Sequence, residues 1–389
     1  MTKTSKKIWI FAGETSGDIY GAQLADEMRK LGQQSNVDVT VEGMGGPEMK
    51  KAGVNILVDS TELGVVGLIE VFKHIFTFIK IFRYLVKKAV AEKPDAIILI
   101  DYPGFNLRFA AQMYKHNIPV IWYISPHVWT WGKKRIPKLA KFCRKMLVIF
   151  PFETDVYKPS GLDTEFVGHP LVDIVEQRRD KSIARDPNTL LLLPGSRAME
   201  VNRLLLPMLQ TAKTLYQRHP NLNFVISTPR PKVFKMCQRV LSEYRNANPD
   251  APEFRLTCGD TPYWQQRAGT GLAASGTVTV ESAIAGLPLV VAYKLNWLTI
   301  LVASMVVRLY RGFFTMVNII ANKEVFEEFL QWHVNAKELS QAVEKILPGG
   351  PKRKQVESEI SNVTKELSGG SEGALRKAAK ACFTFTTQK

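Results

Sequence analysis

The chain has 389 residues, which suggests two or three domains because one domain typically has about 100–200 residues. Its 46% hydrophobic and 23% charged residues are typical of a globular protein and exclude a disordered, fibrous or disulfide-dense one. The formal net charge of +16 indicates an anionic partner, which is nucleic acid, a phosphorylated substrate or an anionic membrane.

Short β-branched runs alternate with longer amphipathic stretches in the first part of the chain, a pattern typical of parallel βαβ units. In chain order the predicted elements are strand Lys7–Ala12, helix Gly21–Leu31, strand Asp95–Ile100, helix Leu107–Lys115, and strands Pro119–Ile124, Met146–Phe150 and Thr164–Val167. They predict an α/β domain over residues 1–170.

The alternation restarts after the charged stretch Glu176–Arg185 and predicts a second α/β domain over residues 171–345. Its predicted elements are strand Thr189–Leu193, helix Glu200–His219, strand Asn223–Ser227, helix Lys232–Tyr244, strand Phe254–Thr257, helix Pro262–Ala268, strand Gly271–Ala274, helix Thr277–Ala285 and strand Pro288–Tyr293. We expect two doubly wound parallel-sheet domains that face an interdomain cleft, with ligands at the carboxyl ends of the strands. Helices over residues 346–389 are expected to pack back toward the N-terminal domain.

The sequence predicts neither a membrane-crossing segment nor a metal site. The first apolar run, Ile8–Ala12, is too short for a signal peptide, and Trp297–Val307 has about 11 residues against the roughly 20 that span a bilayer. Four separated cysteines (Cys143, Cys237, Cys258 and Cys382) form no C-x-x-C pair, and His127 and His169 fit no zinc spacing. A reducing cytoplasm is therefore the expected location.

A glycine-containing loop, Gly13–Asp18, follows the first strand, where backbone N–H groups at a helix N-terminus attract anions. An ordinary turn in which Ser16 or Asp18 caps the helix is the alternative. The segment Gly43–Pro47 has the same two interpretations.

Asp101 follows the apolar strand Asp95–Ile100, at the sheet edge where α/β enzymes place catalytic acids and bases. A helix cap or turn residue is the alternative.

Two loops of the second half have the composition of a nucleotide site. In Pro194–Arg197, backbone N–H groups, the Ser196 hydroxyl and the Arg197 guanidinium are expected to form an anion cradle. Ser275, Gly276 and Thr277 repeat the arrangement, and Glu281, one helical turn on, is placed to accept both ribose hydroxyls. A solvated helix glutamate is the alternative for Glu281.

The stretch Leu63–Lys88 carries large apolar residues and basic residues at helical spacing, which predicts a helix lying in an anionic membrane surface. A core helix with extended lysines is the alternative. No acidic residue occurs from Tyr102 to Phe152, so this basic character continues downstream. The residues expected at the membrane are Phe72, Phe76, Ile79, Phe82, Lys80 and Arg83.

Together these motifs resemble the lipid A disaccharide synthases, a family of inverting glycosyltransferases with the GT-B architecture, nearly end to end. The resemblance rests on Gly13–Asp18, Gly64–Gly67 with Glu70 and Val71, Asp101–Asn106, Ser125–Trp131, Phe150–Glu153, Gly168–Asp173, Leu193–Arg197 with Glu200 and Val201, Ser275–Thr277 with Glu281, Gly286–Pro288, and Val317–Asn318.

The resemblance implies transfer of 2,3-diacylglucosamine from its UDP conjugate to 2,3-diacylglucosamine 1-phosphate. The products are a β-1,6 lipid A disaccharide 1-phosphate, a lipopolysaccharide precursor, and UDP, and no metal or other cofactor is implied. The implied enzyme is cytoplasmic and peripheral on the inner face of the inner membrane, and a homodimer remains open.

The resemblance also assigns roles to residues of this chain. Asp101 matches the family's proposed base, with Glu14 and Asp18 as further catalytic candidates. The implied substrate-binding residues are Ser16, Gly17, Ser196, Arg197, Ser275, Gly276, Thr277, Glu281 and Asn318.

Two other functions remain as alternatives. A relative that handles UDP-N-acetylglucosamine, either a murein-precursor transferase or a 2-epimerase, would share the nucleotide loops but would not need the apolar basic helix. A basic nucleic-acid-binding protein would account for the charge, but no nucleic-acid motif is present.

Overall fold

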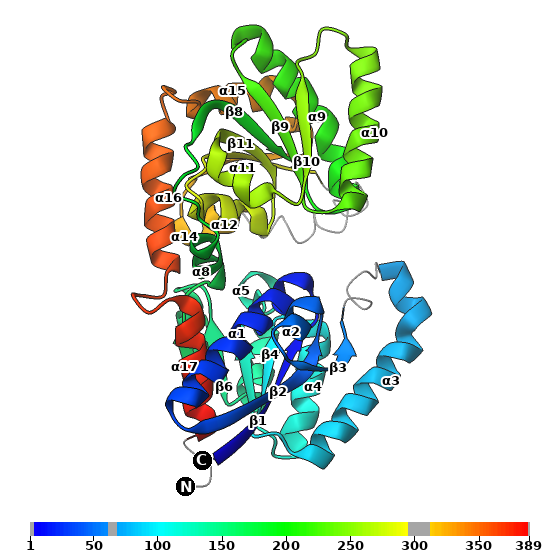
Figure 1. Cartoon of the computed structure of the whole chain (residues 1–389), viewed down its shortest axis with the longest axis vertical. Coiled ribbons are helices and arrows are strands. Elements are labelled where there is room, and N and C mark those ends of the chain that lie inside the picture. The colour runs from blue at the N-terminus through cyan, green and yellow to red at the C-terminus, as the bar shows by residue number, and fades with distance from the viewer. Residues whose placement is uncertain (1–3, 61–67, 295–311, 388–389) are drawn as a thin grey trace. The chain divides into compact units, whose positions relative to one another are not determined.

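The computed structural model describes residues 4–60, 68–294 and 312–387. The chain forms two compact units: residues 1–173 with 367–389, and residues 174–366 (Figure 1). Each unit has its own parallel sheet, so the predicted α/β class with two parallel-sheet domains is confirmed.

The described strands of the first unit form a seven-stranded parallel sheet in the order β3-β2-β1-β4-β5-β6-β7. Their bounds are β1 Thr4–Ala12, β2 Val37–Gly45, β3 Asn55–Asp59, β4 Ala96–Ile100, β5 Val120–Tyr123, β6 Lys145–Val148 and β7 Thr164–Phe166. Every residue of β4 is buried, as expected for a central strand covered on both faces. The sequence analysis missed β2 and β3, and Gly43–Gly45, interpreted as a loop, ends β2.

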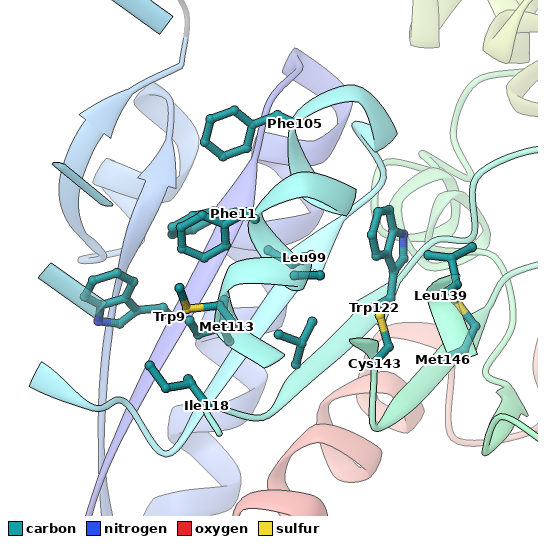
Figure 2. Close-up of a cluster of buried hydrophobic side chains, with 14 of the residues drawn as sticks. Trp9, Phe11, Leu99, Phe105, Met113, Ile118, Trp122, Leu139, Cys143 and Met146 are labelled. Carbon is teal, nitrogen blue, oxygen red and sulfur yellow. The ribbon is translucent and has the colours of Figure 1, made fainter. Parts of the chain in front are cut away.

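Helices cover both faces of this sheet. Their bounds are α1 Thr15–Gln34, α2 Pro47–Lys51, α3 Leu68–Glu92, α4 Pro103–Lys115, α5 Val128–Trp131, α6 Ile136–Phe142, α7 Glu153–Tyr157 and α8 Pro170–Gln177, which continues into the second unit. A buried cluster joins α4 to the strands: Figure 2 shows Phe105 and Met113 of α4 near Phe11 and Leu99. Helix α4 contributes three large buried apolar side chains, Phe105, Phe109 and Met113, and burying them at roughly 1.5–3 kcal/mol each holds the helix on the sheet.

The second unit repeats the topology with the sheet order β10-β9-β8-β11-β12-β13. Its described elements are β8 Asp186–Leu193, α9 Ala198–Arg218, β9 Asn223–Thr228, α10 Pro231–Ala247, β10 Phe254–Cys258, α11 Thr261–Arg267, β11 Ala268–Ala274, α12 Thr277–Ile284, β12 Leu289–Tyr293, α14 Met316–Ala321, β13 Glu327–Leu330, α15 Ala336–Ile346 and α16 Arg353–Leu367. In both sheets successive strands are added first on one side of the first strand and then on its other side. This change falls between β1 and β4 in the first sheet and between β8 and β11 in the second. Ligands of doubly wound folds bind at this switch point.

Of the C-terminal helices expected to pack toward the first domain, α17 (Ala374–Thr387) lies against α1 within the first unit (Figure 1). Helix α16 belongs almost entirely to the second unit.

Among the described helices, none is both long and apolar enough to span a membrane. The apolar run Trp297–Val307 lies outside the described residues.

Candidate active and nucleotide-binding sites

Glu14 and Asp101 leave the first sheet from adjacent strands. Ala12, the last residue of β1, is paired with Ile100, the last residue of β4, so Gly13-Glu14 and Asp101 follow the strands side by side. Glu14 is the N-cap residue of α1. Burial, and to a lesser extent the charge of Glu14, raises the pKa of the Asp101 carboxyl to about 6. A carboxylate with a pKa near the working pH is suited to accept a proton from a hydroxyl group.

The backbone around Asp101 has an uncommon conformation. Asp101 and Tyr102 both have positive φ angles, of 44° and 46°. The ring of Tyr102 lies over Gly13, where a side chain would overlap it. Glycine at position 13 therefore lets the two strand ends approach each other.

Asp18 does not join the two other predicted carboxylates. Its carboxylate is buried and accepts backbone N–H bonds from Gly46 at 2.7 Å, Glu48 at 2.9 Å and Met49 at 3.0 Å. These bonds satisfy the first N–H groups of α2, which otherwise lack partners at a helix start. Asp18 is thus a structural cap of α2, and we do not assign it to the reaction.

Ser16 and Gly17 lie in the first turn of α1. Ser16 is exposed, whereas Gly17 is buried with its Cα facing Ala12 and Ile100. The absence of a side chain at Gly17 lets α1 begin directly above the ends of β1 and β4. Glu14 makes no side-chain cap bond to this helix.

In the second unit, the loop Pro194–Arg197 uses its backbone donors internally. Glu200 accepts hydrogen bonds from the Ser196 N–H at 2.8 Å and the Arg197 N–H at 3.1 Å. The expectation that these N–H groups bind phosphate is therefore corrected, because a carboxylate of the same chain already occupies them. The Arg197 guanidinium forms an ion pair with Glu200, with 3.6 Å between Nη1 and Oε1, but its side chain is 74% exposed. It is therefore accessible to a ligand, as is the exposed residue Ser196.

The second predicted loop, Ser275–Thr277, lies next to the first, because Ala273 of β11 is paired with Leu193 of β8. Gly276 is the N-cap residue of α12, and no side chain caps this helix. The space around the Gly276 Cα is open within the described chain. At the uncapped start of α12, backbone N–H groups can therefore donate hydrogen bonds to a phosphate.

Glu281, one turn inside α12, is half-buried. Burial raises the pKa of its carboxyl, while the positive charge of Arg178 and a hydrogen bond from Gln265 lower it. A half-buried carboxylate next to the open start of α12 is better suited to accept hydrogen bonds from ribose hydroxyls than a fully solvated glutamate would be.

Asn318 of α14 is buried, and all its side-chain hydrogen-bonding groups have protein partners. Its Nδ2 donates to the Phe326 carbonyl at 2.7 Å and Glu328 at 2.9 Å. Its Oδ1 accepts from the N–H groups of Val325 and Phe326, both at 2.8 Å. Asn318 therefore holds the segment leading into β13 and is not available to bind substrate in this conformation.

Helix α3 has one face that packs against the core and an opposite face that is exposed. Phe82 and Leu85 pack against the core, with Phe82 edge-on to Phe105 at 5.5 Å between ring centroids. Phe76 is 76% exposed and Ile79 is 40% exposed. Lys80, Arg83 and Lys87 lie on the same outer face and are exposed. Phe72 lies outside the residues whose side chains are described.

A buried carboxyl lies beyond β6, at the end of the motif Phe150–Glu153, and the sequence alone assigned it no role. Glu153 of α7 is fully buried, and burial raises the pKa of its carboxyl to about 8. It accepts a hydrogen bond from the Phe150 N–H at 3.2 Å. Around it the rings of His127, Trp129, Phe150 and Phe152 contact one another.

His169 is a linker residue: its Nδ1 accepts from the Leu171 N–H at 3.1 Å, and burial lowers its pKa to about 3. Over residues 4–60, 68–294 and 312–387, no three His, Cys, Asp or Glu side chains are grouped as a metal ion would require.

The sequence matches the family model described as "Lipid-A-disaccharide synthetase" over residues 8–382. It is 36% identical over 388 residues to the lipid-A-disaccharide synthase of Syntrophus aciditrophicus, covering 98% of each chain. It is 35% identical over 392 residues to that of Koribacter versatilis, covering 98% of this chain and 99% of the relative.

Among solved structures, a putative UDP-N-acetylglucosamine 2-epimerase from Listeria monocytogenes aligns with a TM-score of 0.68 at 12% identity, over 99% of this chain and 98% of that one. The S. aureus MnaA-UDP co-structure aligns with a TM-score of 0.65 at 12% identity, over 98% of this chain and 96% of that one. These structural neighbours support the predicted GT-B-type fold, and the sequence relatives show that the chain belongs to the lipid-A-disaccharide synthetase family.

Proposed function

We propose that this protein transfers 2,3-diacylglucosamine from its UDP conjugate to the 6-hydroxyl of 2,3-diacylglucosamine 1-phosphate. The products are a β-1,6-linked disaccharide 1-phosphate and UDP. Family membership supports the reaction, and the observation that carries the chemistry is the half-buried carboxyl of Asp101 at the switch point of the first sheet, with a pKa of about 6.

In this proposal Asp101 accepts the proton of the acceptor 6-hydroxyl as its oxygen attacks the anomeric carbon, and the bond from that carbon to the UDP oxygen breaks. A single displacement of this kind inverts the anomeric configuration. Glu14 raises the pKa of Asp101, which makes the carboxylate a stronger base at neutral pH.

The second unit binds the UDP portion in the same proposal. Arg197 and the open N-terminus of α12 contact the diphosphate, and Glu281 accepts the ribose hydroxyls. Both contacts stabilise the leaving group, because a positive side chain and helix N–H groups favour the negative charge that develops there. Asn318 has no direct substrate contact in this scheme.

We further propose that the outer face of α3 docks the protein on the cytoplasmic surface of the inner membrane. Phe76 and Ile79 are exposed apolar side chains on the face that also carries Lys80, Arg83 and Lys87. Partial insertion of two such side chains contributes a few kcal/mol, and each basic residue near an anionic surface adds about 1 kcal/mol. This is sufficient for reversible attachment to the membrane in which acylated substrates reside.

The experiment that tests the reaction incubates the purified protein with UDP-2,3-diacylglucosamine and 2,3-diacylglucosamine 1-phosphate. Disaccharide 1-phosphate and UDP in equal amounts are expected. Epimerisation of UDP-N-acetylglucosamine without disaccharide formation would favour the 2-epimerase alternative instead.

A further inference from the structure

We propose that Asn106 is a positioning residue for the reaction: its side-chain amide fixes the backbone of Ile100 and Asp101, and so orients the Asp101 carboxyl. This inference rests on the proposed function, in which Asp101 is the base.

The segment that Asn106 contacts is strained. Asp101 and Tyr102 are consecutive non-glycine residues in the left-handed region, with φ of 44° and 46°. This conformation is uncommon for residues with a side chain, and it persists only where the surroundings hold it. The surroundings must therefore supply contacts specific to these two residues.

Asn106, in the first turn of α4, supplies them. Its buried side-chain Nδ2 donates to the Asp101 carbonyl at 2.8 Å and to the Ile100 carbonyl at 3.3 Å. The Asp101 N–H donates to the Tyr123 carbonyl at 3.1 Å. Both backbone polar groups of Asp101 are thus held, one by the neighbouring strand β5 and the other by Asn106.

Asn106 also contacts the second strained residue. Its backbone N–H donates to the Tyr102 carbonyl at 3.1 Å, while the Tyr102 ring lies over Gly13. The backbone that carries the Asp101 carboxyl is therefore held by hydrogen bonds at Asp101 and at Tyr102. Loss of the amide would free the Asp101 carbonyl and let the pair relax toward an ordinary conformation.

The unused oxygen of the Asn106 amide supports this role. Its Oδ1 is buried and has no hydrogen-bond partner within the described part of the chain. A buried polar atom without a partner costs stability, so an apolar residue of the same size would relieve that cost. What asparagine provides at this position is therefore the pair of hydrogen bonds from its Nδ2 to the carbonyl groups at the end of β4.

The test compares Asn106→Leu and Asn106→Ala with the wild type in the disaccharide assay, over a range of pH. A control, Met113→Ala, creates a cavity near the C-terminal end of the same helix; Figure 2 shows Met113 and Phe105 at opposite ends of α4. Asn106→Leu keeps the branching of the side chain at Cγ but is larger, and Asn106→Ala avoids overpacking should the leucine variant fail to fold. Thermal denaturation identifies the folded variants, and Asp101→Asn is assayed alongside.

We expect kcat to fall about 10- to 100-fold in both Asn106 variants, because small misplacements of a catalytic group cost rate by such factors. The KM for the UDP-sugar should not change. The acid limb of the pH profile of kcat/KM should move to lower pH, because the pKa of the Asp101 carboxyl falls when the carboxyl becomes more exposed to solvent. Met113→Ala should keep the wild-type limb even if its stability falls.

A folded Asn106 variant that keeps the wild-type acid limb would overturn the proposal, because a merely structural loss reduces the amount of active enzyme without moving the limb. Failure of the base assignment would appear separately, as wild-type turnover in Asp101→Asn.

Discussion

Asp101 and Glu14 follow paired residues of adjacent strands, and their proximity contributes to the raised pKa of the Asp101 carboxyl. Burial is the larger cause, and the two effects together bring the pKa to about 6. The same two effects make the ionised carboxylate unfavourable in the folded protein. Catalytic advantage and a cost in stability therefore arise from one arrangement.

Asp101→Asn should lower kcat about 10²–10⁴-fold, because it keeps the side-chain shape and removes the proton acceptor. UDP binding should persist, because the groups proposed for UDP lie in the other unit. Steady-state kinetics and UDP titration by calorimetry check the two parts. Near wild-type turnover would make Glu14 the candidate base.

The same substitution should stabilise the protein at neutral pH. A free aspartate titrates near 3.9, so in the folded protein ionisation of Asp101 is penalised increasingly from about pH 4 to pH 6 and constantly above that. Asp101→Asn should raise the free energy of unfolding by about 1–3 kcal/mol at pH 7.5 and have no effect near pH 3. Denaturant unfolding at both pH values measures this, with Asp250→Asn, an exposed ion-paired aspartate, as a control that should not gain stability. A less stable Asp101→Asn at pH 7.5 would contradict the burial argument.

Arg197→Ala should weaken UDP binding by about 1.5–3 kcal/mol, the range for hydrogen bonds to charged groups. Arg239→Ala, an exposed arginine of α10, is the matched control and should bind UDP as the wild type does. Isothermal titration with UDP measures both. If Arg197→Ala binds with unchanged affinity, the diphosphate assignment is wrong.

Membrane binding should have two separable parts. Replacing Phe76 and Ile79 by Ser should reduce sedimentation with anionic vesicles at every salt concentration, because the apolar contribution is not screened. Replacing Lys80, Arg83 and Lys87 by Gln should matter mainly at low salt, because physiological salt screens interactions between charges more than about 8–10 Å apart. Phe82 stays unchanged in both variants, since it packs on Phe105 and its loss would disturb the core.

Should the wild type ignore the vesicles, or should the serine variant bind them as well as the wild type does, α3 is not the docking surface. Thermal denaturation of both variants separates lost binding from unfolding.

The sequence patterns predicted the strands with continuous apolar runs, such as β4, and the loops that follow them. They missed β2, whose final glycines have the composition of a turn, and β13, which is short and polar. Asp18 and Asn318 were interpreted as functional because their motifs match a family. Their partners lie 28 to 31 and 7 to 10 residues further along, and only the tertiary structure shows that these partners use the side chains fully.

The most direct measurement of the central claim is the anomeric configuration of the disaccharide, determined by proton NMR on products of the wild type and Asp101→Asn. A single displacement assisted by Asp101 predicts an inverted, β-1,6-linked product from the wild type and very slow formation of the same product by the variant. A product that retains the donor's configuration, or equal rates for the two proteins, would contradict the account.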